Sequence, residues 1–326
     1  MKRLILPLVC LAACSSQSTP SGLGEPVRAS YGLTSNAQFR AGALPGSPPL
    51  TTAEALSGVQ PALPSTSVNV AGSVIQEGDS GFTIGGIATG QAVAVGIRFL
   101  GLGSGYWVLP VTGEDPTSPG NYTWGATLDF GAAIPSGFQS LAVVAIDANG
   151  HGGSQETTKL CVASDIPDNL RECSPTSTPP ATVLSLAWDT PVDLDLRVVT
   201  PSGKIVDPKH PSTADAVNGK IDPTAPNTGV FDTDALRGCI DTGHRRENLV
   251  WQDAPDPGVY FVYASLYDAC GQADVHFTLS LNQPEAVPDG GTPLLGQTFE
   301  RSGELLAVSA DAGASLGLFV TEFVVQ

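Results

Sequence analysis

The stretch Asp193–Val199 (DLDLRVV) decides the fold class of the C-terminal part of the chain. Charged and apolar residues alternate strictly along it, which is typical of a strand with one face in a core and the other outside it. Val183–Trp188 also places its apolar residues on one face, and Gly258–Tyr267 is a further strand candidate. No segment has a convincing helical period of useful length. The pattern predicts an antiparallel β-sandwich over residues 182–326.

The residues before this region predict a second sandwich. Tyr122–Phe130 alternates, and the apolar run Ser140–Ile146 (SLAVVAI) is followed by a strong turn, Asp147-Ala148-Asn149-Gly150. The order of these elements resembles that of bacterial immunoglobulin-like modules, which implies an immunoglobulin-like β-sandwich over residues 67–173. Residues 174–181 (SPTSTPPA) contain three prolines and predict an interdomain linker. The fold class expected for the whole chain is therefore all-β.

The N-terminal residues have the pattern of a targeting segment. Residues 1–14 (MKRLILPLVCLAAC) begin with a basic pair and continue with ten mostly apolar residues. A membrane-spanning helix needs roughly 20 apolar residues, so this stretch fits an export signal. Leu11-Ala12-Ala13-Cys14 resembles the lipobox of bacterial lipoproteins, which implies a signal peptide over 1–13 and lipidation of Cys14. The alternative is an ordinary signal peptide in which Cys14 occurs by chance. Ser15, in place of Asp, resembles the pattern that is sorted to the outer membrane.

Residues 14–66 are rich in Ser, Thr, Pro and Gly, and their apolar runs are short. This composition predicts a flexible or partly extended tether between the membrane anchor and the folded domains. The chain as a whole has 32 acidic and 15 basic residues, a formal net charge of −17. Binding to phosphate groups requires clustered Lys and Arg, so this charge balance argues against nucleic acid as a partner.

The cysteines that remain after the anchor are Cys161, Cys173, Cys239 and Cys270. An even number in an exported chain predicts two disulfides, and four cysteines allow three pairings. Proximity along the chain favours Cys161–Cys173 and Cys239–Cys270. A zinc site would need closely spaced pairs such as C-x₂-C, and the sequence has none.

Gly78-Asp79-Ser80-Gly81 is similar to the nucleophile motif of trypsin-like proteases. In that family the catalytic His precedes the Ser, whereas the first His here is His151. A hydrolytic Ser needs a His as its general base, so we interpret this motif as a turn. No His pair has the spacing of a metalloprotease site.

The C-terminal region also contains an ordered string of short motifs. It runs Trp188-Asp189, Asp193-Leu194-Asp195-Leu196, Pro201-Ser202-Gly203, Glu247-Asn248, Trp251 and Pro257-Gly258-Val259-Tyr260. Over residues 183–281 this order resembles the YfaP-like family, bacterial domains of unknown function with a β-sandwich core. Where family members often have Gly-Pro before the Glu-Asn pair, this chain has Arg245-Arg246. The family supplies no established enzymatic activity.

Within this string, Asp193 and Asp195 lie on the same face of one expected strand. Their carboxylates repel each other unless a cation or hydrogen-bond donors lie between them, and oxygen ligands suit Ca²⁺. Two interpretations remain open: the acids hold Ca²⁺, or they cap turns and accept backbone hydrogen bonds with Arg197 as a charge partner. The candidate calcium ligands are Asp189, Asp193, Asp195, Asp241 and Glu247.

These features predict a lipid-anchored envelope protein of the outer membrane with a binding, adhesion or structural role. Its expected partner is another envelope protein or a polysaccharide. The alternative is an anchored hydrolase, acting for example on glycans, that uses the carboxylates around Asp193 and Asp195. An open, deep pocket holding both acids would favour the hydrolase.

Overall fold

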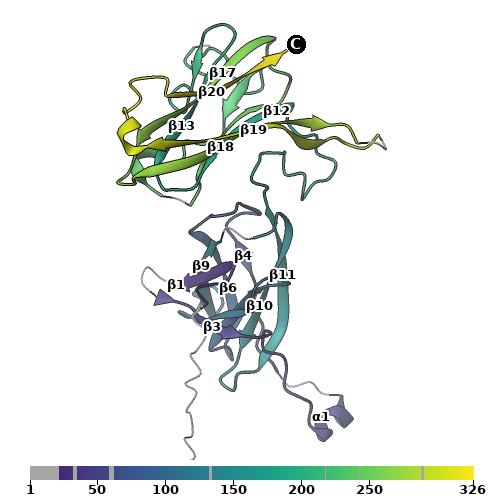
Figure 1. Ribbon diagram of the computed structural model, residues 1–326. Coiled ribbons are helices and arrows are strands. Elements are labelled where there is room, and N and C mark those ends of the chain that lie inside the picture. Colours follow the sequence, from purple (N-terminus) through teal and green to yellow (C-terminus); the bar gives the residue numbers. More distant parts are fainter. Residues whose placement is uncertain are drawn as a thin grey trace, which may run out of the picture.

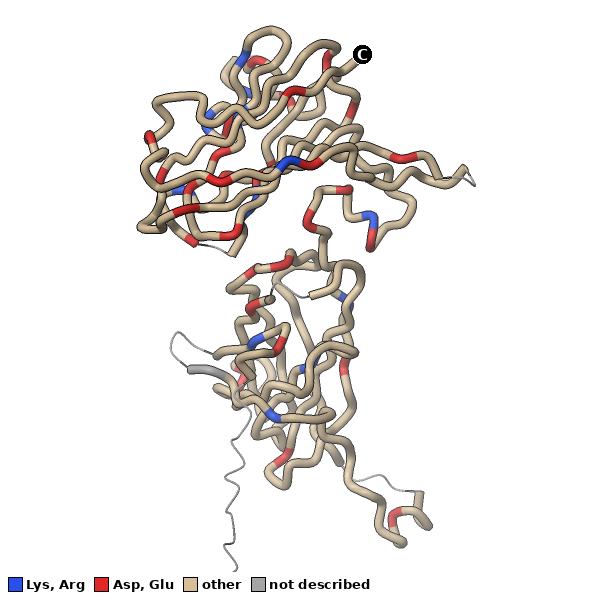
Figure 2. Tube along the Cα trace, in the orientation of Figure 1, with Lys and Arg blue, Asp and Glu red and all other residues tan. Residues whose placement is uncertain are grey.

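The computed structural model describes residues 22–31, 35–58, 62–131, 134–216, 218–241, 243–287 and 290–326. These residues form two antiparallel β-sandwiches, each made of two sheets and stacked end to end (Figure 1). The prediction of an all-β chain with two sandwiches is confirmed. Figure 2 shows acidic residues spread along both sandwiches and few basic ones.

The N-terminal sandwich packs a five-stranded sheet on a six-stranded one. The first sheet has the order β2-β1-β9-β6-β4, with β1 (Val27–Tyr31), β2 (Ser35–Asn36), β4 (Asn69–Val70), β6 (Phe82–Thr89) and β9 (Asn121–Phe130). The second has the order β3-β8-β7-β10-β11-β5, with β3 (Gln38–Ala41), β5 (Val74–Ile75), β7 (Ala94–Phe99), β8 (Gly105–Pro110), β10 (Gly137–Ile146) and β11 (Gly152–Val162). All pairs are antiparallel except β5 with β11. The alternating apolar side chains of both sheets meet in one core.

The expectation of a tether over the whole of residues 14–66 is wrong for residues 27–41. This segment supplies β1, which pairs with β9, and β3, which pairs with β8. Its apolar residues are few but alternate, and Phe39 packs edge-on against the ring of Trp107 at 5.2 Å. Strand β1 buries Val27 and Ala29 and β3 buries Phe39, which is enough when the neighbouring strand is already in place. Residues 27–41 therefore contribute strands to both sheets of the first sandwich.

The rest of the expected tether includes one short helix, α1 (Thr52–Ser57). Thr51 caps it: its hydroxyl accepts the Glu54 N–H, and the Glu54 carboxylate accepts the Thr51 N–H, which is a capping box. Among the residues that the structure describes, no helix is long and apolar enough to cross a membrane.

The C-terminal sandwich packs a five-stranded sheet on a four-stranded one. The first has the order β15-β16-β12-β18-β19, with β12 (Thr182–Trp188), β15 (Gly229–Phe231), β16 (Arg246–Trp251), β18 (Asp274–Glu285) and β19 (Leu294–Leu306). The second has the order β14-β13-β17-β20, with β13 (Asp193–Val199), β14 (Ile205–Val206), β17 (Gly258–Asp268) and β20 (Leu318–Val325). Two 3₁₀ turns, η1 (Arg237–Cys239) and η2 (Ala307–Ser309), lie between strands.

Strand β13 has the alternation that its sequence predicts. Leu194, Leu196 and Val198 are fully buried in the core between the two sheets. Asp193 and Asp195 point to the other side of the sheet, and they are buried as well. Strand β13 therefore buries apolar side chains on one face and charged side chains on the other.

Both disulfides expected from the cysteine spacing are formed. Cys161–Cys173 joins the end of β11 to the segment before the linker, and Cys239–Cys270 joins η1 to the turn after β17. The second bridge closes a loop of about thirty residues, a length at which a native disulfide stabilises a small domain by roughly 2–5 kcal/mol. It also fixes the segment before Cys239 beside the outer face of β13.

Polar contacts join the two sandwiches. The Nε2 atom of His244 lies 2.9 Å from Oδ1 of Asp79, and Arg246 pairs with Asp165 at 3.4 Å. The backbones of the two loops approach closely, because a Cβ atom at Gly243 would lie 2.7 Å from the carbonyl oxygen of Gly78. The Gly78-Asp79-Ser80-Gly81 motif is thus part of a turn that contacts the second sandwich.

The titration of this junction predicts a pH dependence. The hydrogen bond with Asp79 raises the pKa of His244, while burial and then a hydrogen bond with Asp165 raise the pKa of Glu77 to about 7. The positive charges of Arg246 and His244 lower the pKa of Glu77 and so partly offset this rise. Both groups bind their protons more tightly when the junction is closed, so the closed state is favoured at low pH and weakens as the pH rises through neutrality.

We therefore expect the two sandwiches to move more independently at about pH 8.5 than at about pH 5.5. Small-angle X-ray scattering should show a broader distribution of distances at the higher pH. His244→Ala should give this broad distribution at both pH values, whereas His151→Ala, in the first sandwich, should behave like the unmodified chain. A His244→Ala profile that still tightens at low pH to the same extent would contradict the assignment.

Candidate functional site

The candidate site is an acidic cluster on the outer face of β13. Asp193 and Asp195 have exposed fractions of only 3% and 5%, and the segment that carries Asp234 lies against them. One carboxylate oxygen from each of these three residues lies within 4.8 Å of the other two. Oxygens so close together carry mutually repelling charges when all three groups are ionised.

Few donors offset these charges. Oδ2 of Asp193 accepts a hydrogen bond of 3.0 Å from the N–H of Gly238 in η1. No hydrogen bond to the Asp195 carboxylate is found among the described residues, and its ionic neighbour is Nη2 of Arg197 at 3.7 Å. Asp234 has an ionic contact of 3.8 Å with the exposed Arg237. The cluster is therefore short of hydrogen-bond donors.

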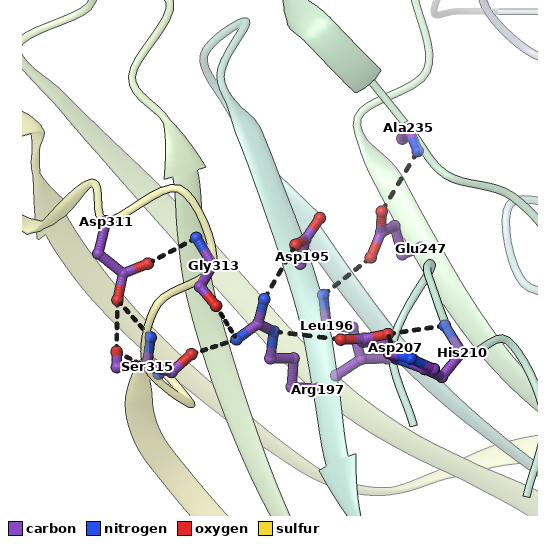
Figure 3. Close-up of polar contacts among 11 residues, drawn as sticks. Asp195, Leu196, Arg197, Asp207, His210, Ala235, Glu247, Asp311, Gly313 and Ser315 are labelled. Atoms are coloured by element: carbon purple, nitrogen blue, oxygen red, sulfur yellow. Dashed lines mark hydrogen bonds and ion pairs between the residues drawn. The ribbon is translucent and has the colours of Figure 1, made fainter. Parts of the chain in front are cut away.

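Arg197 is shared among several groups (Figure 3). Its Nε atom lies 3.7 Å from the carboxylate of Asp207, and its Nη1 atom donates hydrogen bonds to the carbonyl oxygens of Gly313 and Ser315. Asp207 in turn accepts hydrogen bonds from both the backbone and the ring of His210. One guanidinium thus contacts two carboxylates, so it neutralises only part of the local negative charge.

Glu247 lies under the cluster, between the two sheets. Its side chain is fully buried, and its carboxylate accepts hydrogen bonds from the N–H of Leu196 at 2.8 Å and of Ala235 at 3.3 Å (Figure 3). Leu196 follows Asp195 in β13, and Ala235 follows Asp234. Glu247 therefore ties together the two segments that carry the clustered acids.

Burial makes these carboxylates difficult to ionise. It raises the pKa of Asp195 to about 7, and the neighbouring Asp193 adds to the effect. Burial and then the charge of Asp195 raise the pKa of Glu247 well above its usual range. Burial also raises the pKa of Asp193. A cation between the carboxylates, or protons on them, would remove this repulsion.

Ser265 is a further polar side chain beside the cluster. It lies directly across from Asp195 in the β13–β17 pair, and its neighbours Ala264 and Leu266 face the core. Its side chain therefore faces the same side of the sheet as Asp195. The residue is fully buried, and its hydroxyl oxygen has no hydrogen-bond partner among the described residues. Such an oxygen is uncommon in folded proteins and calls for a partner such as an ordered water or an ion.

The structure brings together only some of the five acids that the sequence suggests. Asp193 and Asp195 meet, and Glu247 lies beneath them as a hydrogen-bond acceptor. Asp189 lies elsewhere, 3.2 Å from the ring of His276, in a hollow of about 390 Å³. Asp241 pairs with Arg245 at 3.1 Å and accepts the N–H of Gly243. The prediction that Asp189 and Asp241 join the cluster is therefore wrong, because Asp189 directly after β12 and Asp241 between η1 and β16 pair with other residues.

Sequence reasoning missed Asp234 and Ser265. Asp234 fits no known ligand spacing, and the cluster forms because the Cys239–Cys270 bridge holds its segment over β13. That bridge was the one available signal, since Asp234 lies five residues before Cys239. Cys239 and Cys270 also lie close to Asp268, but their sulfur atoms are joined in the disulfide and are not metal ligands.

Comparisons with known proteins give no family. No protein-family model and no curated protein sequence matches the chain. Among solved structures, the chain is similar to the fibronectin(III)-like modules of Clostridium thermocellum CbhA, with 12% identity and a TM-score of 0.19, covering 76% of this chain and 97% of that one. It is also similar to the C-terminal domain of the Streptococcus agalactiae AgI/II polypeptide BspA, with 10% identity, a TM-score of 0.23, and 73% and 99% coverage. At these scores the likeness carries no argument about function.

The position of Glu247 predicts how its variants behave. Glu247→Ala leaves the buried N–H groups of Leu196 and Ala235 without an acceptor, which should lower the free energy of unfolding by roughly 2–4 kcal/mol. Glu247→Gln retains an acceptor oxygen and should cost clearly less. Glu304→Ala, at an exposed position of β19, is the matched control and should be close to neutral. Denaturant unfolding measures all three, and equal stability of the alanine variant and the control would refute the bridging role.

Proposed function

We propose that this chain is a lipid-anchored envelope protein of the outer membrane whose two β-sandwiches serve a binding, adhesion or structural role. The lipobox-like sequence before Cys14 supports the anchor; Cys14 and the signal peptide lie outside the described residues. The two disulfides support an exported location, because such bridges persist in oxidising compartments. In the sequence β1, the first strand of the first sandwich, begins 13 residues after Cys14.

The burial of Asp193 and Asp195 is the observation that carries this proposal over a hydrolase. A glycosidase needs two carboxyl groups that reach a substrate from an open cleft. Here both acids lie beneath a covering segment, with exposed fractions of 3% and 5%. The hollow beside Asp189 and His276 is lined by residues of β12, β18 and β19, and neither Asp193 nor Asp195 is among them. Covered acids of this kind support a role in holding the domain together.

The negative net charge of the chain supports a partner other than nucleic acid. The net charge of −17 disfavours contact with phosphate groups, and the proposed partner is an envelope protein or a polysaccharide. The proposal includes a relationship of residues 183–281 to YfaP-like domains, which their order of motifs resembles. Its motifs lie on or directly after β12, β13, β16 and β17, the strands that build the C-terminal core and the acidic cluster.

The lipid anchor predicts the fate of Cys14→Ser. Without the thiol that receives the lipid, the protein should move from the membrane fraction to the soluble fraction, because the lipid on Cys14 is the proposed anchor. Fractionation of cells that express each form measures this, and the control Cys161→Ser, which breaks the Cys161–Cys173 disulfide but keeps Cys14, should leave the protein in the membranes. Protease treatment of whole cells then shows whether the second sandwich is exposed outside. Sedimentation of the Cys14→Ser protein with outer membranes would contradict the proposal.

A further inference from the structure

We propose that one Ca²⁺ ion binds between the carboxylates of Asp193, Asp195 and Asp234, with the hydroxyl of Ser265 beside them. This site replaces the set of five acids suggested by the sequence: it keeps Asp193 and Asp195, adds Asp234, and excludes Asp189, Asp241 and Glu247. It does not depend on the lipid anchor or on the partner of the protein.

The spacing of the oxygens supports the ion. Calcium binds oxygen ligands at 2.3–2.6 Å, so two oxygens on one ion lie at most about 5 Å apart. The three carboxylates meet this limit, since one oxygen of each lies within 4.8 Å of the other two. Three carboxylates offer up to six oxygens, and Ca²⁺ takes six to eight. The arrangement therefore has the size and the ligand type that calcium requires.

The unsatisfied hydroxyl of Ser265 is the independent observation. A buried hydroxyl without a partner costs free energy, and its oxygen lies on the face of the sheet that carries Asp195. Calcium binds neutral oxygens as well as carboxylates, so the hydroxyl oxygen of Ser265 is chemically suited to complete the ligand set. The hydroxyl and the donor-poor carboxylate of Asp195 thus point to the same occupant.

The local charge supports a divalent cation. Asp193, Asp195 and Asp234 carry three formal charges, and Arg197 shares its single charge between Asp195 and Asp207. Calcium adds two positive charges at the centre of the cluster. Magnesium demands near-ideal octahedral geometry and keeps several waters, which suits a covered cluster of side chains less well.

The surrounding structure holds the ligands in place without the ion. The carboxylate of Glu247 fixes Leu196 and Ala235, each next to a proposed ligand. The Cys239–Cys270 disulfide fixes the segment after Asp234, and the N–H of Gly238 within it bonds to Asp193. These constraints lower the entropy cost of closing the site around the ion.

Equilibrium dialysis of the full mature chain in detergent against radioactive calcium tests the proposal. We expect one ion per chain, bound with a dissociation constant of roughly 10⁻⁴–10⁻³ M, as in other extracellular modules. Asp195→Asn and Asp234→Asn should each weaken binding by at least about tenfold, while Asp189→Asn, whose carboxylate lies outside the cluster, should bind as the unmodified chain does. Magnesium at the same concentration should displace little of the calcium.

Thermal unfolding of the same proteins separates a metal ligand from a residue needed only for folding. At about 10 mM calcium the melting temperature of the unmodified chain should rise by roughly 4–8 °C relative to EDTA. Asp195→Asn removes one repelling charge, so in EDTA it should melt at or above the unmodified chain, yet it should lose the response to calcium. An Asp195→Asn chain that keeps the full response, or an unmodified chain that shows none, would overturn the proposal.

Discussion

The C-terminal sandwich depends on the burial of charged side chains on the outer face of β13. A strand that packs leucines and valine inward normally leaves its other face in water. Here Asp193, Asp195 and Arg197 are also buried, so their charges must be met by protein groups or by an ion. The surrounding contacts follow from that requirement: the carboxylate of Glu247 joins two segments, and the carbonyl oxygens of Gly313 and Ser315 accept from Arg197.

The disulfide between Cys239 and Cys270 and the acidic cluster belong to one arrangement. The bridge brings a loop from the first sheet over the second, and this loop supplies Asp234 and the N–H of Gly238. Without the covering loop, Asp193 and Asp195 would face water, where two carboxylates repel only weakly. Covering them raises the cost of their charges and restricts what can lie between them. This combination of a closed loop and covered acids favours a stabilising cluster over a catalytic one.

The sequence predicts the strands better than it predicts the site. The alternation of DLDLRVV is found in β13 with the expected face in the core, and both disulfides follow the shortest spacing. Residues 27–41 were not predicted as strands, because one or two buried side chains per strand give too weak a pattern among Pro, Gly and Ser. The sequence does not predict that Asp234 and Ser265 lie beside Asp195. Their positions arise from a disulfide and from strand register, and neither leaves a local spacing in the sequence.

The central claim is that the covered carboxylates of β13 surround a calcium ion. The most direct measurement is an anomalous difference map from crystals of the mature protein grown in millimolar calcium. The account predicts one peak surrounded by oxygens of Asp193, Asp195 and Asp234, with the hydroxyl of Ser265 turned toward it. A map without an anomalous peak, in which the carboxylates bond directly to one another or to the side chain of Arg197, would contradict it.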